Sequence, residues 1–274
     1  MNRKLFYRIM IHGFLIAMVI ITVTPFIWMI LSSFKSNTEI LNQDQAFLPK
    51  EFITDNYEKV NQQFHFMQYF RNSIFVVSAI TILASYTSAL CGYVLCKYQF
   101  RLKKLAFGIV MATMMLPWCV TIIPRYYIIK QIGWLNSYKA LIIPSLFSGF
   151  GIFMMKQNME AIPNEILEAA KIDGGNEFFI FHRIVIPMSK NGIFAIAIFQ
   201  FLWAWEDYLW PYLVITKPDK QLISVGLKMF NGQYQTDYGS LFAATVISII
   251  PVIIVYLLLQ KRFVEGIATS GLKG

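Results

Sequence analysis

Few residues in this sequence have the types and spacing that catalysis or metal binding requires. The sequence contains no G-x-x-x-x-G-K-[ST] phosphate-binding loop, no H-E-x-x-H pair and no G-x-S-x-G nucleophile motif. Its three histidines are scattered, and none has a plausible partner nearby in the sequence. The three cysteines, Cys91, Cys96 and Cys119, lie in or beside apolar segments without a disulfide or metal-binding spacing. We therefore expect no catalytic residue, no metal, no cofactor and no ATP site in this chain.

Two adjacent carboxylates, Glu206 and Asp207, interrupt a long apolar run. Acidic side chains inside a membrane span are costly and indicate a cavity or a charged partner. Tryptophans at positions 203, 205 and 210 flank the pair, as in the aromatic belts at membrane interfaces. Two interpretations remain open: the carboxylates line a solute path, or they lie among hydrated lipid headgroups.

The composition is that of an integral membrane protein. Apolar residues make up 57% of the 274 residues, charged residues only 14%, and the mean hydropathy is +0.53. A soluble domain carries about 25% charged residues. The net charge of +9 comes from lysines and arginines clustered beside apolar runs, which favours membrane topology signals over nucleic-acid binding.

A transmembrane helix needs about 20 mainly apolar residues. Six spans are predicted on this basis, the fourth of them shorter and interrupted by Pro144, Gly149 and Gly151. The first is too long for a secretory signal and lacks a cleavage site, so we expect it to be retained. Pro117 is expected to kink the third. The predicted spans are residues 9–32, 72–95, 105–123, 140–155, 192–211 and 241–259 of a single transmembrane domain, 1–274.

The basic residues predict the orientation of these spans. The short loop after the second span holds the densest basic cluster, Lys97, Arg101, Lys103 and Lys104. Short basic loops remain in the cytoplasm. Both termini and the loop 156–191 are therefore expected to be cytoplasmic.

Within that loop, residues 163–187 predict two short amphipathic helices joined by a glycine turn. Pro163 suits a helix start, Gly174 and Gly175 suit a helix end, and Asn176 suits the cap of the second helix. Apolar and aromatic side chains lie along both helices. One interpretation is a docking surface for another protein, and the alternative is a loop that lies along the membrane.

The same stretch carries a family resemblance. Glu168-Ala169-Ala170, then Gly174, then Ile184 to Pro187 resembles the EAA signature of bacterial ABC importer permeases, with Ile186 where that signature has leucine. Nearly the whole chain resembles the sugar-importer branch, and is similar to the second maltose-transporter permease subunit. The resemblance includes 205–211, 250–251 and 263–274, although Glu206 stands where the family usually has asparagine.

The resemblance implies an all-helical, six-span permease of the bacterial inner membrane. Its implied partners are a second, non-identical permease, two ATPase subunits and an extracytoplasmic solute-binding protein, within a lipid bilayer and without nucleic acid. The implied ATPase-coupling residues are Glu168, Ala169, Ala170, Asp173, Gly174, Ile184 and Pro187. The implied tail contact to the ATPase is Gly271, Lys273 and Gly274, for which a frayed end is the alternative.

The resemblance also implies transport of a sugar or oligosaccharide. Aromatic faces and polar groups commonly hold sugars, so the candidate path residues are Trp118, Gln200, Trp205, Glu206, Asp207 and Tyr208, with Tyr126 and Tyr127. In maltose-type systems the partner permease carries the main sugar site. We further expect Gly174→Asp to uncouple transport, because a side chain at this turn would block the reversal between the two helices.

Three alternatives remain. A self-sufficient secondary transporter would show internal repeats and charged relay residues at mid-membrane, and no repeat is evident. An ABC permease for a polyol or a glycerol phosphate ester would share the coupling signature. An intramembrane enzyme would need a nucleophile and a base, and no such set stands out.

Overall fold

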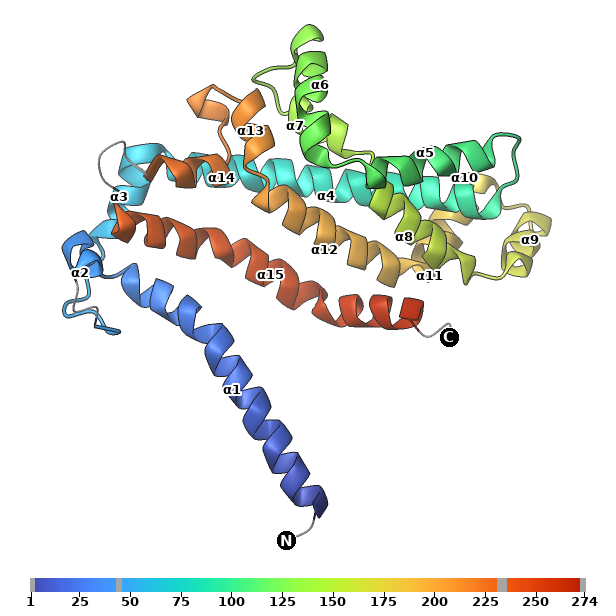
Figure 1. The fold of residues 1–274 in the computed structure, drawn as a ribbon. Helices are drawn as coiled ribbons and strands as arrows, with labels where there is room; N and C mark the ends of the chain where they lie inside the picture. The colour runs from blue at the N-terminus through green and yellow to red at the C-terminus, as the bar shows by residue number, and fades with distance from the viewer. Residues whose placement is uncertain (1–2, 43–45, 231–235, 272–274) are drawn as a thin grey trace. The chain divides into compact units, whose positions relative to one another are not determined.

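The computed structural model describes residues 3–42, 46–230 and 236–271 (Figure 1). All regular elements within these residues are helices, which confirms the expected all-α class. The chain forms two compact units. The first comprises Met1–Met67 and Gly226–Ile250, and the second comprises Gln68–Val225 and Pro251–Gly274.

The described residues supply between four and six candidate membrane spans. Four stretches qualify alone: Tyr7–Ser32 in α1 (Arg3–Ser32), Phe66–Lys97 (α4), Lys139–Glu160 (α7, Lys139–Ser145, with α8, Gly149–Glu160) and Tyr238–Gln260 in α15 (Tyr238–Gly271). Two bent pairs qualify only when joined. They are α5 (Lys103–Met115) with α6 (Trp118–Gln131), bent by 107°, and Glu177–Met188 with α12 (Lys190–Glu206), bent by 79°.

In the first unit, polar contacts hold the end of α1. The side chain of Asn56, at the start of α3 (Asp55–Phe64), is buried and donates to the carbonyls of Ser33 and Lys35, both at 2.8 Å. These bonds satisfy carbonyl groups of the buried chain that directly follows α1. The short helix α2 (Asn37–Leu41) follows. The most apolar stretch of α1 is not buried within the structure, as expected of a helix surrounded by lipid.

In the second unit, small residues bring α4 and α8 close together. A Cβ atom added to Gly92 of α4 would lie 2.7 Å from Cβ of Met155 and 2.9 Å from the backbone nitrogen of Lys156. A Cβ atom on Gly151 of α8 would lie 2.3 Å from Oγ of Ser88. Small and hydroxylated residues commonly allow such close helix packing in membranes.

The third predicted span contains a sharper break than the expected kink. Helix α5 ends at Met115, and α6 begins after Pro117 and continues to Gln131. Leu116 is extended (φ −78°, ψ 120°), because the ring of a following proline disfavours helical geometry. Helix α6 therefore runs well beyond residue 123, where the third predicted span ends.

The fourth and fifth predicted spans also differ in their limits. Two helices cover the fourth, separated at residues 146–148 by the N-cap of Ser148, and α8 continues to Glu160. Helix α12 ends at Glu206 rather than at residue 211, because Asp207 is extended. The chain then forms α13 (Leu209–Val214), followed by η2 (Pro218–Lys220), α14 (Ile223–Gly226) and η3 (Leu227–Phe230).

Candidate functional site

The sequence between α8 and α12 folds into the predicted pair of short helices, at one end of α4 (Figure 1). Helix α9 (Asn164–Ile172) starts after Pro163, whose extended backbone makes it the N-cap rather than the first helical residue. Asn176 caps α10 (Glu177–Ile180), and its Oδ1 accepts a hydrogen bond of 2.8 Å from the backbone N–H of Phe179. The helix–turn–helix prediction is thus confirmed for the backbone.

The turn between α9 and α10 depends on Gly174 and Gly175. Gly174 has φ +86°, in the left-handed region that favours glycine. The backbone N–H of Gly175 donates to the carbonyl of Ala170 at 2.9 Å, which satisfies one of the last carbonyls of α9. No heavy atom lies within 4 Å of a Cβ atom added to Gly174, so a side chain there would meet backbone strain at φ +86° rather than steric overlap. The expected effect of Gly174→Asp stays a prediction.

A π-helix, η1 (Phe181–Val185), follows α10 and leads into α11 (Ile186–Met188). The backbone N–H of Ile186 donates to the carbonyl of Phe181, five residues earlier. Pro187 has no N–H to donate, and widened turns of this kind occur where the regular ladder is interrupted. Ile184 and Pro187 therefore lie in a continuous but irregular helical segment, ahead of the 79° bend into α12.

We refer to residues 164–188, from α9 to α11, as the hairpin. Leu167 and Ile180 anchor it in a buried apolar cluster with Met155, Met159 and Ile196. Other apolar side chains face outward: Ile172 is 86% exposed and Phe178 is 72% exposed. Among the predicted coupling residues, Glu168, Ala169, Asp173 and Gly174 are exposed, and Ala170 is half-buried against the cluster.

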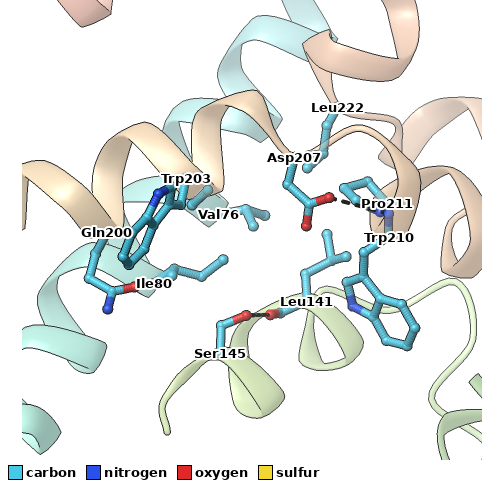
Figure 2. Close-up of a pocket in the computed structure, with 11 residues that line it drawn as sticks. Val76, Ile80, Leu141, Ser145, Gln200, Trp203, Asp207, Trp210, Pro211 and Leu222 are labelled. Atoms are coloured by element: carbon cyan, nitrogen blue, oxygen red, sulfur yellow. Dashed lines mark hydrogen bonds between the residues drawn. The ribbon is translucent and has the colours of Figure 1, made fainter. Parts of the chain in front are cut away.

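The second candidate site is a cavity of about 790 Å³ lined by α6, α7, α12 and α13. Five predicted path residues line it: Trp118, Gln200, Glu206, Asp207 and Tyr208. An adjoining pocket of about 130 Å³ shares Gln200, Trp203 and Asp207 with it. In Figure 2, Gln200 and Trp203 lie on one side of this smaller pocket, and Asp207 and Trp210 lie on the other.

Trp205 does not line either of these pockets, and its predicted place in the path stays a prediction. It is buried, its ring stacks on Phe201 with centroids 5.7 Å apart, and it meets the edge of Phe70 at 6.1 Å. Successive helical residues point in different directions, which separates Trp205 from Glu206. Tyr126 packs against an apolar cluster and Tyr127 is exposed, and neither lines the cavity.

Arg125 of α6 lines the cavity, although it was not among the predicted path residues. Its guanidinium carbon lies 4.1 Å from the ring centroid of Trp210, in cation–π geometry. The Trp210 ring is held in place, because its Nε1–H donates to the carbonyl of Ala140 at 3.0 Å. A single arginine within an apolar run was the available signal, but it fell in a segment predicted to be a loop.

Two hydrogen-bond donors at this site have no partner in the described part of the chain. They are Nε of Arg125 and Nε2 of Gln200, and both atoms are buried. The Asp207 carboxylate accepts a hydrogen bond from the backbone N–H of Trp210 at 3.3 Å. The backbone carbonyl of Asp207 accepts one from the Ser224 hydroxyl at 2.8 Å. Buried donors without partners are costly, which sets these two side chains apart from the rest of the cavity lining.

The remaining predicted positions, Gly271, Lys273 and Gly274, lie at the C-terminal end of the chain. Helix α15 ends at Gly271, while Lys273 and Gly274 lie outside the described residues. No group of three or more His, Cys, Asp or Glu side chains suited to a metal ion occurs among the residues that the structure describes.

Comparison with known proteins identifies one family and several relatives that are named as transport permeases. The family described as "Binding-protein-dependent transport system inner membrane component" matches residues 82–269. The chain is 32% identical to the diacetylchitobiose uptake system permease protein of Streptomyces coelicolor, over 94% of this chain and 86% of that one. It is 31% identical to the arabinooligosaccharides transport system permease protein of Bacillus subtilis, over 98% and 96%.

Solved structures show the same fold. A chain of a bacterial ABC transporter involved in import of the acidic polysaccharide alginate matches with a TM-score of 0.84. The two are 24% identical, and the match covers 96% of this chain and 98% of that one.

Proposed function

Because the chain belongs to the family of binding-protein-dependent transport system inner membrane components, we propose that it is the permease subunit of an ATP-driven importer for a sugar or oligosaccharide. The observation that carries this proposal is the similarity to saccharide permeases along almost the whole chain. The relatives named for lactose and arabinooligosaccharide transport support the same substrate class.

In this proposal the chain supplies the path and a separate ATPase supplies the energy. The complex contains a second, similar permease, two ATPase subunits and an extracytoplasmic solute-binding protein. The chain itself is non-catalytic and binds no cofactor. It lies in the bacterial inner membrane, with both termini and the hairpin in the cytoplasm, consistent with the basic loop between α4 and α5.

The hairpin is the proposed docking element for the ATPase. Ala169 and Ala170 are small enough to let α9 enter a groove, and exposed Glu168 is placed to pair with a basic residue there. Exposed apolar residues such as Ile172 are typical of a surface that is covered in a complex. Closure of the ATPase subunits then displaces the hairpin and switches the spans between inward-open and outward-open states.

The cavity beside Arg125 is the proposed saccharide path on this chain. Trp118, Trp203 and Tyr208 line it with aromatic rings, and Arg125 and Gln200 provide donors. Asp207 and Glu206 provide acceptors, so hydroxyl groups find both kinds of hydrogen-bond partner. A saccharide presents both apolar ring faces and many hydroxyl groups, which matches this lining.

Reconstitution in proteoliposomes tests the proposed function. The complete complex is supplied with ATP inside and a panel of labelled mono- and oligosaccharides with the binding protein outside. We expect uptake that requires both ATP and the binding protein. The chain alone should take up no sugar under a proton or sodium gradient. Gradient-driven uptake by the chain alone would identify a secondary transporter and overturn the proposal.

A further inference from the structure

The carboxylate of Glu177, at the start of α10, makes contacts in two directions. Its Oε1 lies 2.6 Å from Nζ of Lys171, near the end of α9. Its Oε2 accepts a hydrogen bond from the hydroxyl of Tyr98, directly after α4, and lies 3.5 Å from the hydroxyl of Tyr93 within α4. One side chain therefore connects both helices of the hairpin to the end of α4.

A second connection holds the other end of the hairpin to the same helix. The ammonium group of Lys97, the last residue of α4, donates to the carbonyl of Ile162 at 2.5 Å and to Oδ1 of Asn164 at 3.1 Å. These atoms lie at the start of α9. The end of α4 is thus bonded through Lys97 to the start of α9, and through Tyr93 and Tyr98 to Glu177 after the glycine turn.

Other polar and aromatic contacts of the hairpin also involve α4. The His182 ring lies 3.2 Å from the hydroxyl of Tyr86, and the Phe181 ring packs against Tyr86 and Tyr93. Side-chain hydrogen bonds from Glu177, Asn164 and His182 of the hairpin reach α4 or Tyr98. The contacts with α8 and α12 are apolar. Hydrogen bonds fix direction and distance, whereas apolar surfaces are non-directional.

Tyr98 and Lys171, which both donate to Glu177, hold their protons firmly. Burial, followed by the hydrogen bond to Glu177, raises the pKa of the Tyr98 phenol. The hydrogen bond to Glu177 raises the pKa of Lys171. The phenol therefore remains a donor and the ammonium group remains charged at neutral pH.

We propose that Glu177 is a positioning residue that clamps the hairpin to α4, so that displacement of α9 moves α4 instead of being lost at the glycine turn. This inference rests on the proposed function. The turn at Gly174 is exposed and is closed by the backbone hydrogen bond from Gly175 to the Ala170 carbonyl, so α9 can pivot there unless a side chain also spans the turn. The Glu177 carboxylate spans it through Lys171, and holds α4 through Tyr98.

The test measures sugar imported per ATP hydrolysed by the complete complex in proteoliposomes. Glu177→Ala removes every acceptor, and we expect this ratio to fall by about fivefold, as loss of a charge-assisted hydrogen bond to a partly exposed group implies. ATP hydrolysis and co-purification of the ATPase should persist, because α9 still docks. Glu177→Gln retains an oxygen acceptor for Tyr98, so we expect its ratio of sugar imported to ATP hydrolysed to stay close to the wild-type value.

Two further variants separate the contacts of Glu177. Tyr98→Phe should reduce the ratio nearly as much as Glu177→Ala, and combining the two should add little, since they remove one interaction. Lys171→Met should have a smaller effect, because exposed ion pairs contribute little. The matched control is Glu160→Gln, which removes the Lys156–Glu160 pair within α8 and should leave the ratio unchanged.

The outcomes distinguish this inference from the proposed function. If the wild-type complex imports no sugar with ATP, the proposed function fails. If the wild-type complex is coupled and Glu177→Ala is equally coupled, only the clamp is refuted. A loss of assembly in both Glu177→Ala and Glu177→Gln would also refute it, because the residue would then act in folding rather than in transmission.

Discussion

Gly174 and Gly175 are neighbours in the turn between α9 and α10, but a side chain meets a different obstacle at each. At Gly174 the obstacle is the backbone, with φ +86°. At Gly175 it is steric, because an added Cβ atom would lie 2.8 Å from the carbonyl oxygen of Ala170. The two positions should therefore respond differently to substitution.

We predict that Gly174→Asn retains most transport, since asparagine tolerates left-handed geometry, whereas Gly174→Val costs about 1–2 kcal/mol locally. Gly174→Asp should fall between the two. Gly175→Ala should disturb the turn more than Gly174→Asn. Uptake by the reconstituted complex, at matched amounts in the membrane, checks the order. Equal loss in Gly174→Asn and Gly174→Val would contradict a backbone origin.

At the cavity, Arg125 and Gln200 allow a separate prediction about the saccharide path. Arg125→Met and Gln200→Ala each remove a buried donor, and each should weaken apparent sugar affinity by about tenfold, as loss of one hydrogen bond implies. Basal ATP hydrolysis by the complex should change little. The control is Tyr127→Ala on α6, which is exposed and does not line the cavity. Unchanged affinity in both cavity variants would place the main sugar contacts on the partner permease.

The residues of the site were only partly accessible to sequence reasoning. The hairpin was predictable because caps, glycines and apolar spacing are local signals. Cavity residues come from helices far apart in sequence, and no local pattern shows which side chains converge. For this reason Arg125 was missed, and Trp205 was selected although it lines neither pocket.

At the scale of helices, close packing of α4 on α8 is the contact most sensitive to added volume. Gly92→Ala would place a methyl group against Met155 and the backbone of Lys156, which cannot yield easily. We predict a lower apparent Tm and lower yield of the purified chain, at a cost of about 1–3 kcal/mol. The control is Gly108→Ala in α5, where nothing lies within 4 Å of the added atom. That change should be neutral or slightly stabilising, because alanine favours helices. Comparable losses in both variants would contradict the packing argument.

Helix breaks show how far local sequence determines these elements. Pro117 marked one break correctly, because proline restricts the residue before it. The break after Glu206 has no proline or glycine, and depends on tertiary contacts such as the Ser224 hydroxyl donating to the Asp207 carbonyl. The π-helix before Pro187 likewise left no clear mark in the apolar pattern.

At the scale of the whole molecule, we propose that the chain is one component of a larger assembly. It belongs to a family of transport-system membrane components, and we propose that its energy comes from another polypeptide. The hairpin leaves large apolar side chains such as Ile172 and Phe178 uncovered, at the element proposed to receive that energy. The composition correctly indicated a membrane protein, whereas the partners follow only from family membership.

The most direct test of the account is a crosslink between the hairpin and the ATPase. A photoreactive side chain is introduced at Ile172 in the assembled complex, with Met115 of α5, which is 82% exposed, as the control position. We predict an ATPase adduct from position 172, with a yield that changes when ATP binds, and none from position 115. Absence of an ATPase adduct at position 172 in an active complex, or its labelling by an impermeant reagent added outside, would contradict the proposal that this hairpin receives the force of ATP hydrolysis.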